Sequence, residues 1–219
     1  SGDPQTPIAV YDSSQVVAQR LARRLHETNG LIQATSRTEL FQAKVVVLAG
    51  SSPHAPVAKE LIERNVSVVS TSDDIADCLN LLALSELAIN KKATLVIGAA
   101  SSPGMSGLLV RNISKAFDSI DEVHIALHGT GGPACARQHH RALSGQSIGW
   151  HDGEWLRRPA GSGRELCWFP EPVGAYDCYR GELPDPLLIK RAFPELSRVT
   201  ARVSATRRDR VFARMPMLI

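Results

Sequence analysis

The chain has 219 residues, of which 43% are hydrophobic and 21% charged, and its formal net charge is +3 at pH 7. This length and composition predict a globular protein with a real core and exclude a peptide scaffold. No apolar run approaches the roughly 20 residues that span a bilayer, so we expect no membrane segment. The opening residues, SGDPQTP, lack the basic and then apolar character of a secretory signal, which predicts a cytoplasmic protein.

The first half of the chain alternates apolar strand patterns with helical patterns. The predicted strands are Ile8–Tyr11, Leu31–Ala34, Val45–Leu48, Val66–Val69 and Leu95–Ile97. The predicted helices carry apolar positions from Val16 to Leu25, Val57 to Ile62, Ile75 to Ala88 and Leu108 to Ile113. This alternation predicts an α/β fold, a Rossmann-like parallel sheet with helices on both faces, whose functional turns lie beyond the carboxyl ends of the strands.

The second half changes in character after Phe117. Its predicted elements are a strand at Val123–Leu127, a helix at Pro133–Leu143, strands at Trp150–Arg158 and Arg164–Phe169, and one or two strands within Val199–Met215. We therefore predict a boundary near Ser119. Residues 1–118 form a dinucleotide-binding domain, incomplete at its N-terminus, and residues 119–219 form an α+β substrate or dimerisation region with antiparallel strands.

The segment Ala93–Val110, ATLVIGAASSPGMSGLLV, is predicted to be a strand, a tight turn and a helix. The turn at Ser102, Pro103 and Gly104 has little side chain, so a ligand could approach its main chain, and the helix start could face an anion. An ordinary strand-to-helix connection also favours these residues and is an equal alternative.

A dinucleotide-binding domain opens with a glycine-rich loop, and an acidic residue ends the next strand. Two interpretations fit this chain. In one, Ile8–Ala18 is the first strand-turn-helix, with side chains where glycines belong. In the other, which we prefer, Ile8–Asp12 is the second strand, Asp12 is the ribose-binding carboxylate, and the phosphate loop lies upstream of residue 1. An alternative role for Asp12 is to cap the helix that follows.

Histidines, cysteines and arginines give weaker signals. The segment Gly129–Ala134 matches G-x-G-x-x-A, but no acidic strand end follows, so only an anion pocket at this helix start is retained, with Arg137 and His139 or His140 assisting. The pair His124 and His128 lacks further ligands, and the cysteines lack C-x-x-C spacing, so we expect no metal and no disulfide framework.

Arginines crowd the last stretch, at positions 198, 202, 207, 208, 210 and 214. They suit an anionic substrate or a phosphorylated cofactor, although a solvated strand face is the favoured alternative. The net charge is too small and stacking residues are too few for nucleic acid, which we do not expect as a partner.

The run VVVLAGSSPHAPVAKELIERNVSVVSTSDD, together with A-x(4)-ATLVIGAASSPGMSGLLV from Ala88, resembles the NAD(P)-binding domain of the saccharopine dehydrogenase-like family. The stretches His128–Ser144, Ala160–Tyr179 and Thr200–Met217 are similar to the second domain of its short members. The chain departs from the family pattern because it lacks an N-terminal glycine-rich loop and because family proteins continue after a strand like Arg210–Met215.

The resemblance implies an NAD- or NADP-dependent oxidoreductase acting on an amino-acid-like or imine substrate, as a homodimer. It implies that Asp12 lies toward ribose and that Ser102, Pro103 and Gly104 lie near the nicotinamide and the substrate. The cofactor would also lie along Ala49, Gly50, Ser51 and Ser52 and along Ser70, Thr71 and Ser72. As catalytic residues we name His128 and Arg137. The alternative is a degenerate or truncated scaffold that acts by self-association or partner binding.

Overall fold

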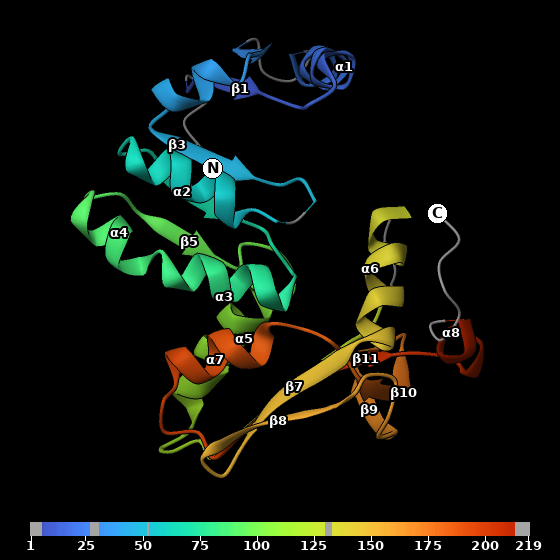
Figure 1. Cartoon of the computed structure of the whole chain (residues 1–219). Coiled ribbons are helices and arrows are strands. Elements are labelled where there is room, and N and C mark those ends of the chain that lie inside the picture. The colour runs from blue at the N-terminus through green and yellow to red at the C-terminus, as the bar shows by residue number, and fades with distance from the viewer. Residues whose placement is uncertain (1–5, 27–30, 52, 130–132, 213–219) are drawn as a thin grey trace.

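A computed structural model describes residues 6–26, 31–51, 53–129 and 133–212 (Figure 1). Its elements follow the expected α/β pattern in the first half and a mixed sheet in the second. The predicted fold class, a Rossmann-like parallel part and an α+β part with antiparallel strands, is confirmed. Within the described residues, none of the helices is both long and apolar enough to cross a bilayer.

Two parallel sheets make up the first half. Strand β1 (Ile8–Val10) pairs with β2 (Ile32–Ala34), and β4 (Ser67–Ser70) lies between β3 (Val45–Leu48) and β5 (Leu95–Ile97). The helices are α1 (Gln15–His26), α2 (Ala55–Glu63), α3 (Ile75–Ala83), α4 (Ser85–Asn90) and α5 (Met105–Ile113), with 3-10 turns η1 (Thr38–Gln42) and η2 (Ser114–Ala116).

One face of the three-stranded sheet forms a core with α2, α3 and α4. Ala58 and Leu61 of α2, Val68 of β4 and Leu81 of α3 are fully buried there. The side chains of Val45 and Val47, which alternate with buried Val46 on β3, are 53% and 61% exposed. Among the described residues, strand β3 therefore has one buried face and one face exposed to solvent.

The second half is a six-stranded mixed sheet built around β11 (Arg198–Ser204). Strand β6 (Glu122–Leu127) pairs with β11 in parallel, whereas all the other pairings are antiparallel. The remaining strands are β7 (Gln146–His151), β8 (Glu154–Pro159), β9 (Glu165–Phe169) and β10 (Gly174–Arg180), and the helices are α6 (Pro133–Ser144), α7 (Asp185–Ala192) and α8 (Arg207–Phe212).

The two faces of this sheet differ. Val199, Ala201 and Val203 of β11 are buried in a core that includes Leu143 of α6 and Phe193 after α7. Because side chains alternate along a strand, Arg198, Thr200 and Arg202 lie on the opposite face, which we call the open face. Both α6 and α7 contact β11 on the core side.

Several predicted elements were wrong. The segment Trp150–Arg158 is not one strand, because a turn with positive φ at Asp152 and Gly153 joins β7 to β8. The prediction of strand after Ser204 was wrong as far as Phe212, because Thr206 and Asp209 form a reciprocal cap that starts α8. Residues 213–215 of the predicted range lie outside the described residues. Strand β10 and helix α7 were not predicted, and the helix predicted from Ile75 to Ala88 is divided at Leu84. The predicted boundary at Ser119 falls between η2 and β6, and the division into two domains stays a prediction.

Candidate functional site

The carboxyl ends of β3, β4 and β5 meet at one edge of the parallel sheet, which we call the carboxyl edge. Main-chain hydrogen bonds continue past the strands, since Thr71 N donates to Leu48 O at 3.1 Å and Ala99 N donates to Ser70 O at 2.9 Å. At this edge Ala49, Gly50 and Ser51 are exposed. A Cβ placed on Gly50 would meet no atom within 4 Å, so this turn borders open space. A flat ligand can therefore approach the main chain here.

The side chain of His54 holds the turn after β3 in place. Its ring is buried, with Nδ1 at 2.8 Å from Ser70 Oγ and Nε2 at 3.0 Å from the carbonyl oxygen of Gly50. A carbonyl can only accept, so Nε2 carries a hydrogen and donates it to Gly50. Ser70 Oγ accepts from Ser72 N at 3.2 Å, which leaves the Ser70 hydroxyl proton for Nδ1. One histidine thus joins the turn that follows β3 to the last residue of β4.

The carboxylate of Asp77 on α3 binds the main-chain nitrogens of His54 and of the residue after it. The carboxylate accepts from His54 N at 2.8 Å and from Ala55 N at 2.9 Å, the donors that open α2. Burial alone raises the pKa of Asp77, but hydrogen bonds from the Ser72 side chain and from these two main-chain donors outweigh it and lower the pKa. The ionised carboxylate is therefore a fixed structural anion beneath the carboxyl edge.

Helix α6 borders the carboxyl edge. The arrowheads of β3 and β5 point to the side of the molecule where α6 stands (Figure 1). Burial raises the pKa of Asp73, which follows β4, and the Gln138 side chain on α6 hydrogen-bonds to its carboxyl group. Burial lowers the pKa of His139, one residue further along α6. The Asp73 and Gln138 contact therefore connects the two halves of the chain beside the edge.

The turn after β5 is anchored to α7. Ser102 Oγ donates to Asp185 Oδ2 at 2.6 Å, and Ser106 Oγ donates to Asp185 Oδ1 at 2.5 Å. The Pro103 side chain is fully buried, and a Cβ on Gly104 would lie 2.2 Å from the carbonyl oxygen of Ala100. The Ser102 hydroxyl and the Pro103 ring are thus occupied by protein contacts, and their role beside a nicotinamide stays a prediction.

Asp12 lies at the carboxyl end of the separate β1–β2 pair. It is exposed, and its Oδ1 accepts from Ser14 N at 2.8 Å just before α1 begins. This bond closes a turn before α1 rather than capping its first turn, because the first main-chain bonds of the helix run to Ser14 O. The cap and the ribose contact both stay predictions. Ser52 and residues 130–132 of the proposed anion pocket lie outside the described residues.

The two candidate catalytic residues lie on different elements. His128 follows β6, and its ring centroid is 4.6 Å from that of Tyr176 and 5.3 Å from that of Phe169. Arg137 is exposed on α6. The ring of His124 lies 2.8 Å from Glu122 Oε2 and 2.8 Å from Thr200 Oγ1. In the part of the chain that the structure describes, His128 and Arg137 make no direct contact, so their shared role stays a prediction.

Sequence reasoning missed the polar residues that support the edge, namely His54, Asp77 and Asp185. All three are buried. The available signal was positional: His54 and Asp185 stand at the start of helices, and Asp77 lies in an apolar helix face with Cys78 and Leu81. A buried polar side chain in such a place needs partners, which predicts a structural network.

Neither a protein-family model nor a curated protein sequence matches this chain. The solved structure of apo saccharopine dehydrogenase (L-Glu forming) from Saccharomyces cerevisiae is similar, with a TM-score of 0.64 and 18% identity over 96% of this chain and 52% of that one. The fold of this chain resembles that of a saccharopine dehydrogenase. GenD2 of gentamicin A biosynthesis, in complex with NAD, has a TM-score of 0.47 and 14% identity over 91% of this chain and 58% of that one. The chain thus spans about half the length of the saccharopine dehydrogenase that it matches.

Proposed function

We propose that this chain carries the cofactor- and substrate-facing part of an NAD- or NADP-dependent oxidoreductase of saccharopine dehydrogenase-like type. The proposed substrate is a small anionic molecule, amino-acid-like or an imine. The observation that carries the proposal is the carboxyl edge, where Gly50 and its neighbours offer bare main chain to open space. Ligands of open α/β sheets bind at this edge.

The strand pairings support the interpretation in which β1 is the second strand of a dinucleotide-binding sheet. Such a sheet has the strand order 3-2-1-4-5-6. If β1 and β2 are its strands 2 and 3, and β3, β4 and β5 are strands 4, 5 and 6, every pairing among β1 to β5 is reproduced. Only the first strand, between β1 and β3, has no counterpart among the described residues. In that fold the first strand leads into the phosphate loop.

The residues of the carboxyl edge fit a nicotinamide cofactor because their small side chains leave room for it beside the main chain. When bound, the cofactor supplies the hydride chemistry. The chain itself positions the ligand: His54 and Asp77 fix the turns after β3 and β4, and Asp12 is the proposed ribose contact. Arg137 is the proposed contact to a substrate carboxylate, and His128 the proposed proton donor.

Titration of the protein into NADPH and NADH, followed by nicotinamide fluorescence, tests the proposal. We expect saturation at micromolar concentrations. Gly50→Val should weaken binding about tenfold or more, because its side chain enters the open space beside the turn. The control is Gly107→Ala on α5, where a Cβ also meets no atom within 4 Å. Absence of saturation with both cofactors, or equal binding by Gly50→Val, would refute the proposal.

The second candidate function is self-association of a degenerate scaffold. Helix α5 favours it, since Met105, Leu108, Leu109 and Ile113 are each more than half exposed and recur at helical spacing. A second copy of the chain is the proposed partner. Sedimentation at micromolar concentration tests this, and a dimer that Leu108→Glu converts to monomer supports it. A monomer at all concentrations contradicts it.

A further inference from the structure

We propose that the six-stranded sheet holds a second binding site, separate from the carboxyl edge, for a small carboxylate or phosphate anion. The site is a cavity of about 330 Å³ between strands β7, β8, β10 and β11. Three of its lining residues are arginines: Arg158, Arg180 and Arg202. This proposal does not depend on the proposed oxidoreductase function.

The cavity lies where β11 exchanges one neighbour for another. At its start, Arg198 and Val199 pair with β7, and at its end, residues 202–204 pair with β10. Thr200 and Ala201 stand between these two pairings, and both line the cavity. The hollow therefore follows from the strand pairing, which holds its walls in place.

Two of the arginines face each other across neighbouring strands. Arg180 of β10 and Arg202 of β11 are a register pair, so their side chains project from the same face of the sheet. Like charges in directly opposite positions destabilise a sheet. The pairing therefore has an energetic cost that an anion between the two side chains would remove.

Nearby carboxylates do not neutralise the charge of the three arginines that line the cavity. Arg202 forms an ion pair with Glu165 at 2.5 Å and donates to the Gly163 carbonyl at 2.6 Å. Arg180 is half-buried and donates to Ser162 Oγ at 3.4 Å, and burial, with the charges of Arg202 and Arg158, lowers its pKa. In the part of the chain that the structure describes, neither Arg158 nor Arg180 pairs with a carboxylate. Among the described residues, the carboxylate of Glu165 is thus the one that forms an ion pair with these three guanidinium groups.

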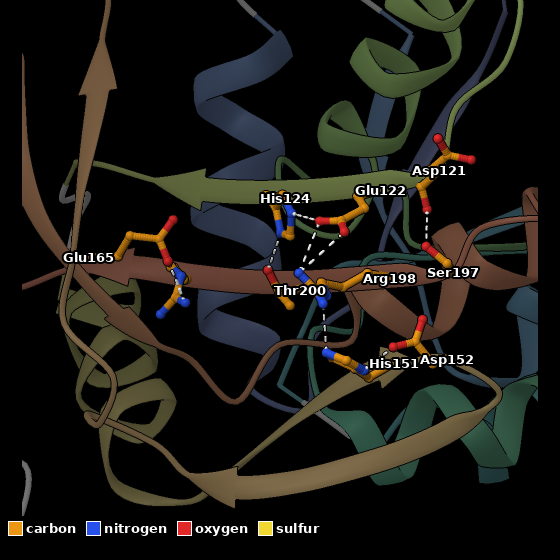
Figure 2. A network of polar contacts seen from close by, with 10 residues as sticks. Asp121, Glu122, His124, His151, Asp152, Glu165, Ser197, Arg198 and Thr200 are labelled. Atoms are coloured by element: carbon orange, nitrogen blue, oxygen red, sulfur yellow. Dashed lines mark hydrogen bonds and ion pairs between the residues drawn. The ribbon is translucent and has the colours of Figure 1, made fainter.

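The neighbouring charges on the open face are already matched to one another (Figure 2). Arg198 pairs with Glu122 at 3.2 Å and contacts His151 Nε2 at 2.8 Å, while Asp152 lies 2.8 Å from His151 Nδ1. The carboxylates of this network are therefore not available to the arginines that line the cavity. We expect an anion from solution to pair with those arginines instead.

The dimensions and donors define the ligand class. A cavity of about 330 Å³ admits a small molecule rather than a folded partner or a nucleic acid. The planar, forked donors of arginine match the paired oxygens of a carboxylate or a phosphate. The Arg202 side chain projects from the face opposite to α6, so this site is distinct from the carboxyl edge that α6 borders.

Isothermal titration calorimetry with glutarate and with inorganic phosphate, at constant ionic strength set by NaCl, tests the proposal. We expect saturable binding of at least one anion, and the stronger of the two identifies the chemistry. Arg180→Gln should weaken that binding about tenfold or more, because a charge-assisted donor is lost. The control, Arg20→Gln on α1, removes an exposed arginine far along the chain and should bind as the parent does.

Thermal unfolding separates loss of the site from loss of the fold. Without anion, Arg180→Gln should melt at or above the parent temperature, because the like-charge pair is relieved. Adding the bound anion should raise the melting temperature of the parent and of Arg20→Gln, but not of Arg180→Gln. No saturable binding of either anion, or equal binding by Arg180→Gln, would overturn the proposal. Neither probe contains nicotinamide, so this outcome is independent of the cofactor titration.

Discussion

Replacement of Asp77 by alanine should destabilise the fold by about 3 kcal/mol at pH 7. The carboxylate accepts from the main-chain nitrogens of His54 and Ala55, and both bonds lie in the buried layer beneath the carboxyl edge. Each buried donor left without an acceptor costs about 1–3 kcal/mol. Urea unfolding followed by circular dichroism measures the loss. The control is Asp74→Ala, which removes an exposed cap of α3 and should cost about 1 kcal/mol.

The effect of Asp77→Ala should also depend on pH. Because the folded-state pKa of Asp77 is lowered, the stability that its ionised form provides is present above the unfolded-state pKa. It is lost as pH falls through the folded-state pKa. The stability gap between parent and variant should therefore stay constant at neutral pH and narrow below about pH 4. A gap under about 0.5 kcal/mol at pH 7, or a gap that widens in acid, would refute the assigned role.

Three further predictions concern other buried or half-buried groups. Asp185→Ala should lower the melting temperature by several degrees, measured by scanning calorimetry, because two serine hydroxyls lose their acceptor. Burial raises the pKa of Glu182, so Glu182→Gln should raise the melting temperature at pH 8, with a smaller gain at pH 4.5. Burial raises the pKa of Cys78 to about 12, so mass spectrometry after alkylation at pH 8 should find Cys167 modified well before Cys78; the reverse order would contradict this.

The parallel half of the fold could be predicted from the sequence because its signals are local. The run Val45–Leu48 is continuous and apolar, and small residues end each strand before a helix with apolar spacing. Periodicity and turn residues suffice for such elements. The paired strands β3, β4 and β5 lie close to the predicted ranges for this reason.

The second half could not be predicted in the same way because its pairing is not local. Strand β11 pairs with β6, more than 70 residues earlier, and takes different neighbours at its two ends. The arginines of β11 alternate as in a strand, but nothing in their spacing shows which of them would stand opposite Arg180. For the same reason the partners of His54 and Asp185 became visible only in the fold.

We propose that the carboxyl edge of β3, β4 and β5 receives a nicotinamide cofactor. The most direct measurement is the amide spectrum of the nitrogen-15-labelled protein during titration with NADPH. We expect the largest shifts at Gly50, Ser51 and Thr71, with small shifts at Arg180. Shifts confined to the six-stranded sheet, or no shifts at saturating cofactor concentration, would contradict it.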